Sequence, residues 1–179
     1  TVVSSRKNPT LRGTAFAQIG RLLKLKEANV LYSALSVFSR VLYSGRELVE
    51  KTSGDSIALQ RCKSDIVNCL KHSDPSIRRR ALDVITALID EENVKSLVPE
   101  VLDYISEADS DFRIELISKI FATVLKFSKD DVWKFDVGLR LIKDHGKFVD
   151  QYLINSICKM VMQSPQLQMH VVGQLVSGL

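Results

Sequence analysis

The chain has 179 residues, of which 45% are hydrophobic and 26% are charged, a length that suits one domain or at most two. This composition excludes a mainly disordered chain, and no run approaches the ~18 uninterrupted apolar residues of a membrane-spanning helix. The low numbers of proline and glycine, 4 and 8, argue against a turn-rich sandwich or barrel. The chain begins with Thr1 and without a signal-peptide pattern, so we expect a segment of a longer protein.

Apolar residues recur every three or four positions along almost the whole sequence, as amphipathic helices require. In chain order, these stripes predict helices over residues 11–23, 30–42, 59–70, 77–88, 94–105, 112–124, 133–141, 153–161 and 167–175. No convincing alternation with a period of two interrupts them. The sequence therefore predicts an all-α fold of about nine helices in antiparallel neighbours, without a sheet.

Capping residues separate the stripes. Asp74 followed by Pro75 is typical of an N-cap and a first helical position. Residues 109–111 and 128–131 place cap and acidic residues before two further stripes, where the helix dipole favours negative charge. Gly146 is expected to end a helix in the left-handed conformation that glycine tolerates.

Two segments of the sequence are similar to each other. An offset of 35 residues places Asp74 on Asp109 and Arg78 on Arg113, with matching apolar positions between them. Helix pairs that repeat every ~34–47 residues indicate an α-solenoid of armadillo or HEAT type, in which pairs stack on their neighbours. We assign the two arginines a structural role, because each lies at the edge of an apolar stripe and its head can reach a carboxylate such as Asp74 or Asp109. We therefore predict that residues 1–179 form a single α-solenoid segment; the alternative is an ordinary helical bundle with accidental self-similarity.

The sequence offers little that resembles catalytic chemistry. None of its three histidines lies in a metal-ligand frame, no glycine-rich loop follows a strand, and paired carboxylates occur only where helices begin or end. Cys62 and Cys69 share one helical face and are expected to be buried hydrophobic residues. Together with Cys158 they make an odd number, which indicates a reducing, intracellular compartment. We expect no enzyme, and no catalytic, cofactor or metal site.

Charge is distributed unevenly along the chain. The net charge is +4, but residues 1–82 carry +9 and residues 83–179 carry −5. The basic part is therefore suited to an acidic partner or membrane surface. Arg79 lies opposite the apolar stripe of its helix and Arg80 lies on its flank, so these two arginines are the candidate partner-binding residues. The alternatives are ordinary solvated charge and nucleic-acid binding, which usually needs arginine or aromatic residues along one groove.

Several short segments have a distinctive sequence: residues 66–71, 74–82, 93–94, 102–105, 112–113, 133–136 and 146–149. These segments resemble the trunk of the large adaptin subunits of clathrin adaptor complexes, and among them gamma-adaptin most closely. The resemblance covers nearly the whole chain and is strongest from Leu59 to Val149. It implies that residues 1–179 are an internal part of a longer adaptin trunk, an α-solenoid that curves around smaller subunits.

The resemblance also implies a coat function. Large adaptins assemble with a second large, a medium and a small subunit into complexes that dock on membranes through phosphoinositides and Arf-type GTPases, select sorting signals and recruit clathrin. We therefore expect a structural and interaction scaffold for vesicle-mediated protein transport between the trans-Golgi network and endosomes. Such a protein is cytoplasmic and peripheral on Golgi or endosomal coated membranes. Its expected partners are the other adaptor subunits, with an Arf-type GTPase and the membrane surface reached through the complex, and no nucleic acid.

Two other functional classes stay open. One is a different solenoid transport protein of the coatomer or karyopherin type, although armadillo-type karyopherins use repeated tryptophans and this chain has one. The other is a helical-repeat nucleic-acid-binding protein, whose affinity for a duplex would depend on salt.

A solenoid segment taken from its array is also expected to expose apolar side chains at both ends, because inner repeats depend on their neighbours for burial. We expect these exposed residues to be Leu11 and Phe16 at one end, and Val172 and Leu175 at the other.

Overall fold

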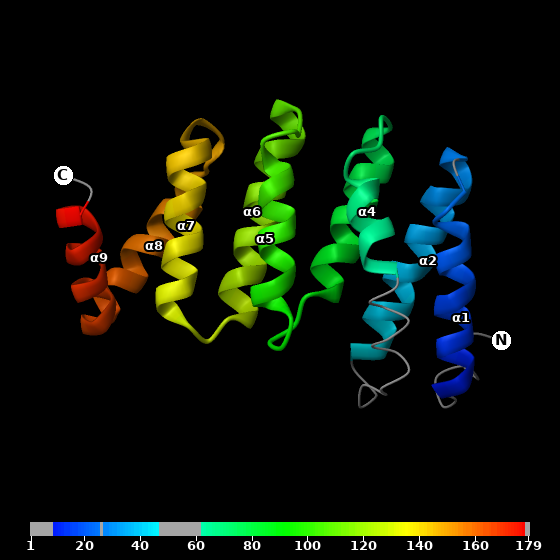
Figure 1. Cartoon of the computed structure of the whole chain (residues 1–179), viewed down its shortest axis with the longest axis horizontal. Coiled ribbons are helices and arrows are strands. Elements are labelled where there is room, and N and C mark those ends of the chain that lie inside the picture. Colours follow the sequence, from blue (N-terminus) through cyan, green and yellow to red (C-terminus); the bar gives the residue numbers. More distant parts are fainter. Residues whose placement is uncertain (1–8, 26, 47–61, 178–179) are drawn as a thin grey trace. The chain divides into compact units, whose positions relative to one another are not determined.

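The structure, a computed structural model, describes residues 9–25, 27–46 and 62–177 (Figure 1). All regular secondary structure in these ranges is helical, and they contain no strand. The chain divides into two compact units, Thr1–Leu88 and Ile89–Leu179. The predicted all-α fold is confirmed for the described residues.

The first unit is built from α1 (Pro9–Leu22), α2 (Ala28–Arg46), a helical segment at residues 62–69 and α4 (Pro75–Leu88). Helix α2 packs against both α1 and α4. Its apolar stripe forms the centre of the core, where the rings of Phe16 and Phe38 lie 5.2 Å apart. Other side chains of this core, all without solvent exposure, are Leu35, Ile66, Leu70, Ile77, Ala81 and Leu82.

The expected exposure of Phe16 is wrong, because this side chain is fully buried. Helix α1 packs against α2 and brings Phe16 onto Phe38, so the helix pair covers the ring itself. The side chains of Leu11 and Leu175 lie outside the described residues. Val172 is 55% exposed, as predicted for the other end of the chain.

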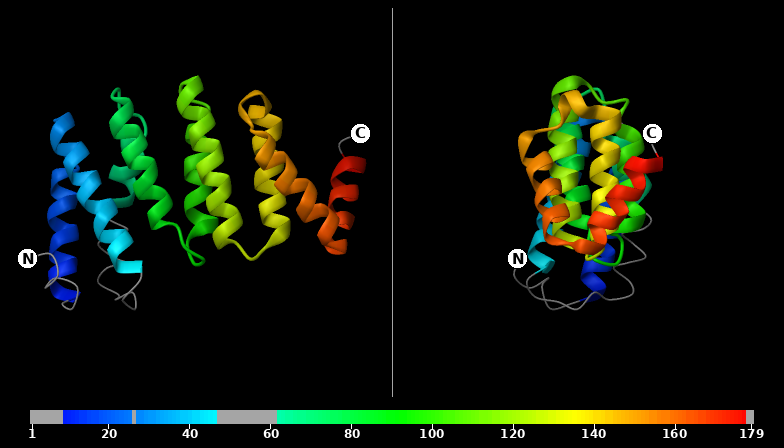
Figure 2. Two further views of the ribbon diagram at one scale, coloured as in Figure 1. Left: turned by 180° about the vertical axis from the view of Figure 1, so that it is seen from behind. Right: turned by 90° about the vertical axis from the view of Figure 1, so that its left-hand side faces the viewer.

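The second unit contains α5 (Val94–Ile105), α6 (Ser110–Phe127), α7 (Asp131–His145), the short 3-10 helix η2 (Gly146–Phe148), α8 (Gln151–Gln163) and α9 (Pro165–Ser177). Consecutive helices of this unit run in opposite directions (Figure 2). Each α-helix packs against the next one along the chain, and α7 also contacts α9. This is the stacking of antiparallel pairs predicted for a solenoid.

Aspartate side chains begin helices in both units. In the first unit, the Asp74 carboxylate accepts a hydrogen bond of 2.8 Å from the backbone N–H of Ser76 at the start of α4, which confirms the predicted cap. In the second unit, three aspartates cap α6, α7 and α8, each accepting from the N–H three residues later instead of two: Asp109 from Phe112 (3.0 Å), Asp130 from Trp133 (3.1 Å) and Asp150 from Leu153 (2.8 Å).

Replacing Asp74 with alanine is expected to lower the free energy of unfolding by about 0.5–2 kcal/mol, because a backbone N–H at the start of α4 loses its acceptor. Urea denaturation of the two proteins measures this difference. Asp74→Asn is the matched control, since it keeps an oxygen acceptor at the same place and should retain most of the stability. Equal losses for both variants would contradict a capping role.

The conformation predicted for Gly146 is wrong. This residue ends α7 as predicted, but its φ of −49° and ψ of −33° are right-handed. The chain continues from Gly146 into η2, and the N–H of Val149 donates to the Gly146 carbonyl over 3.3 Å. The turn therefore tightens into a 3-10 helix instead of reversing its handedness. Among the described residues, none has a positive φ.

Candidate partner-binding surface

The division into units follows the division of charge. Residues 1–88 carry a net charge of +8, and residues 89–179 carry −4. Among the described residues of the first unit, the exposed ionic side chains are mostly basic: Arg21, Lys24, Arg40, Lys71 and Arg79, beside the single acidic residue Glu27. This part of the chain therefore offers mainly positive charge to a partner.

The two candidate arginines, which are neighbours on α4, have different surroundings. Ile77, Ala81 and Ile85 form the buried face of α4. Arg79 lies on the opposite side of the helix and is exposed, as its helical angle predicts. Arg80 is half-buried on the flank. The structure therefore leaves Arg79 accessible to a partner and turns Arg80 toward α2.

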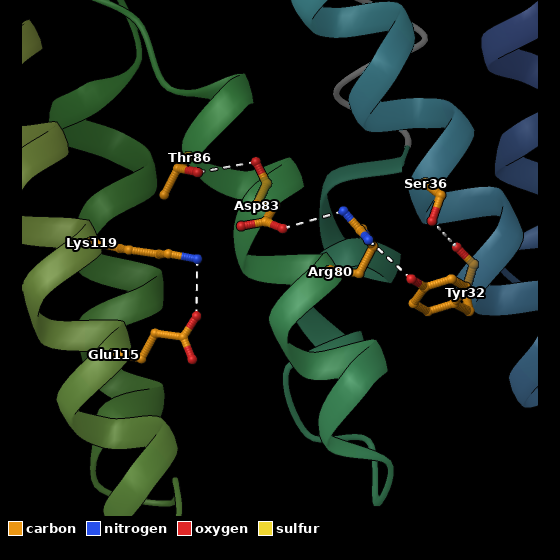
Figure 3. A network of polar contacts seen from close by, with 7 residues as sticks. All are labelled: Tyr32, Ser36, Arg80, Asp83, Thr86, Glu115 and Lys119. Carbon is orange, nitrogen blue, oxygen red and sulfur yellow. Dashed lines mark hydrogen bonds and ion pairs between the residues drawn. The ribbon is translucent and has the colours of Figure 1, made fainter.

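Arg80 connects α4 to α2 through Tyr32 (Figure 3). Its Nη2 donates a 3.0 Å hydrogen bond to the Tyr32 hydroxyl, and its guanidinium carbon lies 5.2 Å from the centre of the tyrosine ring. Its Nη1 also lies 3.5 Å from the Asp83 carboxylate. The hydrogen bond to Tyr32 and the charge of Asp83 both raise the pKa of Arg80. Sequence reasoning missed Tyr32, which lies 48 residues before Arg80.

A double-mutant cycle with Arg80→Met and Tyr32→Phe is expected to give a coupling free energy of about 0.5–1 kcal/mol. The reason is that the tyrosine hydroxyl offers the guanidinium a hydrogen bond at a partly exposed site, where such contacts have modest energies. Denaturant unfolding of the four proteins measures the coupling. Strictly additive losses would show that the two side chains stabilise the fold independently.

The repeated arginines Arg78 and Arg113 close the turns that precede their helices. Each guanidinium donates to two backbone carbonyl oxygens at the end of the preceding helix or just after it. The contacts are Arg78 Nη1 to His72 (3.0 Å) and Ser73 (3.1 Å), and Arg113 Nη2 to Ser106 (2.9 Å) and Ala108 (2.7 Å). The structural role predicted for both arginines is thus confirmed, but these contacts are made to backbone carbonyl oxygens where a carboxylate was expected.

Cys62 and Cys69 are buried, as predicted. Burial, and secondarily the charge of Asp65, raises the pKa of the Cys69 thiol to about 11, and burial likewise raises the pKa of Cys62. Both side chains are therefore protonated at neutral pH and behave as small hydrophobic groups. Among the residues that the structure describes, no three histidine, cysteine, aspartate or glutamate side chains are placed to hold a metal ion.

A hollow of about 590 Å³ lies in the first unit beside the turn between α1 and α2. Buried Leu23, Leu31 and Cys69 line it together with charged and polar groups, among them Lys24 and Asp65. Its charges are of both signs, so the hollow itself does not select an acidic ligand.

Comparison with known proteins decides the family of this chain. All of its residues, 1–179, match the family model described as the adaptin N-terminal region. The chain belongs to the adaptin family. The resemblance noted in the sequence is thereby confirmed.

Several relatives of this adaptin chain are gamma subunits. It is 31% identical over its whole length to "AP-1 complex subunit gamma-2" of Arabidopsis thaliana, and it covers 20% of that protein. It is also 31% identical over its whole length to "AP-1 complex subunit gamma" of Dictyostelium discoideum, of which it covers 19%. Over 99% of the chain it is 30% identical to "AP-2 complex subunit alpha-2" of the same organism and covers 17% of it. The chain thus spans about a fifth of the length of these curated relatives.

The segments that carried the resemblance lie on defined elements of this adaptin chain. Residues 74–82 contain the cap and part of the buried face of α4, and residues 133–136 lie near the start of α7. Within the described ranges, no helix is both long and apolar enough to cross a bilayer.

Proposed function

We propose that this adaptin chain is a scaffold segment of the large gamma-type subunit of a clathrin adaptor. In this proposal residues 1–179 form one continuous α-solenoid within a longer trunk. The observation that carries the proposal is the match of the whole chain to the adaptin N-terminal region, together with 31% identity to AP-1 gamma subunits along its full length. A stack of antiparallel helices suits such a scaffold, because it offers an extended surface to several partners at once.

The proposed partners are the other subunits of a heterotetrameric adaptor, namely a second large, a medium and a small subunit. An Arf-type GTPase and the membrane surface are reached through the assembled complex. The proposed place of action is the cytoplasmic face of Golgi or endosomal coated membranes, where the complex sorts cargo for clathrin-coated vesicles. The role is structural and does not involve enzymatic activity.

Co-purification tests this proposal. An affinity-tagged full-length protein that contains this chain is expressed in its own cells, and the proteins retained with it are identified by mass spectrometry. Medium and small adaptor subunits are expected in near-stoichiometric amounts. Recovery of nuclear-transport cargo or coatomer subunits in their place would overturn the proposal.

Within this function, we propose that Arg79 contacts an acidic partner. Support comes from its exposed position on α4, in the unit whose described exposed charge is mostly basic. Arg80 is less suited to this role, because it is half-buried on the flank of α4 and holds Tyr32 of α2. Reversing Arg80 would therefore disturb the packing of α2 on α4 as well as any contact with a partner.

Arg79→Glu isolates the contact, and Arg40→Glu on α2 is its control, because Arg40 is also exposed and the change in net charge is the same. Binding of the full-length protein to a partner subunit or to an Arf-type GTPase is measured at several salt concentrations. Arg79→Glu alone should weaken binding and make its salt dependence shallower, since fewer charges are neutralised on association. Equal effects of the two reversals would indicate general electrostatic attraction and contradict a specific contact.

A further inference from the structure

Helices α2, α4 and α6 can be aligned by their buried faces. Phe38 on α2, Ile85 on α4 and Ile120 on α6 then coincide, and each is at most 1% exposed. The same alignment brings together further buried residues of the three helices and, before the turns, of the helices that precede them: Ala34, Ala81 and Leu116; Leu35, Leu82 and Ile117; Leu23, Leu70 and Ile105. Because no gap is needed, the three turns that lead into α2, α4 and α6 have the same length.

One position near the start of these helices differs in residue type. It holds Arg78 on α4 and Arg113 on α6, but Leu31 on α2. The backbone at this position is alike in all three helices, since each N–H donates to the carbonyl oxygen four residues earlier, over 3.0 Å for Leu31, 3.2 Å for Arg78 and 2.8 Å for Arg113. The turn between α1 and α2 therefore lacks the guanidinium that closes the other two turns.

The turn between α1 and α2 (Figure 1) still has the acceptors that such a guanidinium would use. The alignment equates the carbonyl of Leu25 with that of His72, and the carbonyl of Lys24 with that of Ser106, which accept hydrogen bonds from the two arginines. Among the described residues, none donates a hydrogen bond to the carbonyl oxygen of Lys24 or of Leu25. The acceptors are thus present without their donor.

The hollow of about 590 Å³ lies where this guanidinium is missing, and Leu31 lines it. Buried Leu23, Leu31 and Cys69 offer apolar surface to the methylene stem of an arginine, while the Asp65 carboxylate offers negative charge to its head. Within the described ranges, no cation forms an ion pair with Asp65. Lys24 also lines the hollow, but it is exposed, so its long side chain can turn its ammonium group to solvent.

We propose that this hollow is a binding site for an arginine side chain of another protein. The guanidinium takes the place that Arg78 and Arg113 occupy at the equivalent turns, donates to the carbonyl oxygens of Lys24 and Leu25, and pairs with Asp65. Arginine suits the site better than lysine, because its planar head has five donors and can contact several acceptors at once. The first unit carries a net charge of +8, so the segment that brings the arginine is expected to be otherwise neutral or acidic. The inference rests on the repeated turns and not on the proposed adaptor function.

Saturation-transfer NMR tests the chemistry of this site, because it detects weak ligands of large proteins. The full-length protein that contains this chain is titrated with N-acetyl-arginine amide and with N-acetyl-citrulline amide, which has nearly the same shape but no charge. Saturable binding of the arginine probe is expected. The citrulline probe should bind at least about threefold more weakly, since a neutral urea forms weaker hydrogen bonds to carboxylate and carbonyl oxygens. Equal binding of the two probes would overturn the proposal.

Substitutions in the hollow locate the binding. Leu31→Arg supplies the missing guanidinium from the chain itself and should abolish binding of the arginine probe. Leu31→Met is the matched control, because it changes the same position without adding a charge and should retain binding; circular dichroism checks that both variants fold. Asp65→Asn leaves Leu31 in place and should weaken binding about threefold or more. The proposal is wrong if a folded Leu31→Arg variant, or Asp65→Asn, binds the arginine probe as the unchanged protein does.

Photocrosslinking tests whether the arginine comes from another protein. Leu22, next to Leu23 at the end of α1 and 41% exposed, is replaced with benzoylphenylalanine in the full-length protein, and the crosslinked peptides are sequenced by mass spectrometry. They should come from another protein and contain an arginine close to the crosslink, and their yield should fall in Leu31→Arg. Crosslinks to segments without arginine or to the same polypeptide, or equal yields with and without Leu31→Arg, would contradict the proposal.

Discussion

Replacing Phe38 with alanine is expected to lower the free energy of unfolding by about 3–5 kcal/mol, the loss typical of a large aromatic side chain removed from a core. Phe38 has no solvent exposure, and its ring lies 5.2 Å from that of Phe16. The substitution removes the ring contact that Phe38 makes with Phe16 and leaves a cavity in the core of the first unit. Urea denaturation followed by circular dichroism measures the loss.

The residue before Phe38 provides the control. Val37 lies on the same helix and is 47% exposed, so Val37→Ala removes apolar atoms that are already partly in water. Its cost should stay within about 0.5 kcal/mol, as for most surface substitutions. Similar losses for the two variants would mean that the buried face of α2 has been assigned incorrectly.

Gly138→Val should destabilise the second unit by about 1–3 kcal/mol, although valine has a better helix propensity than glycine. Gly138 is buried where α7 passes between α6 and α8. A Cβ atom there would overlap Ile157 Cδ1 and come within 3.0 Å of Phe121 Cε2. The helix must therefore move away from its neighbours, and the loss of packing outweighs the gain in propensity. Thermal and urea unfolding report the net effect.

Gly173→Val makes the same change at an open position of α9, where nothing besides the adjacent residues and the backbone of α9 lies within 4 Å of the new Cβ atom. Its effect should remain within about 0.5 kcal/mol. Adding Ile157→Val to Gly138→Val should recover part of the loss, because it removes the Cδ1 methyl group that the new Cβ atom overlaps. Equal destabilisation by valine at the two glycine positions would show that backbone preference, and not close packing, determines the result.

Much of this fold is predictable because its determinants are local. The apolar stripe of α4 and its Asp74 cap depend on residues a few positions apart, and the structure has them as the sequence predicts. Gly146 was misassigned because the handedness of a helix end depends on whether the next turn continues, which here means the formation of η2. Phe16 was misassigned because its burial depends on a ring contributed by another helix.

For the candidate partner-binding surface, too, local features could be predicted from the sequence and contacts between distant residues could not. The exposure of Arg79 follows from its angle on α4 alone. The contact between Arg80 and Tyr32 joins residues 48 positions apart, and no local pattern indicates which side chain of α2 will lie beside α4. The sequence also does not reveal whether a glycine inside a helix is merely tolerated or required there. For Gly138, only the packing of α6 and α8 around it shows that a glycine is required.

The arginine contacts at the turns have a consequence for the order in which the chain folds. Arg113 belongs to α6 but holds carbonyl oxygens at the end of α5, and Arg78 of α4 does the same for the turn after residues 62–69. Each turn is therefore completed only when the first turn of the following helix has formed. The loops closed in this way span only five to seven residues, so their entropic cost is small and their closure is fast. A chain built like this can gain structure one helix pair at a time as it leaves the ribosome, with α4 and α6 each fixing the end of the helix before it.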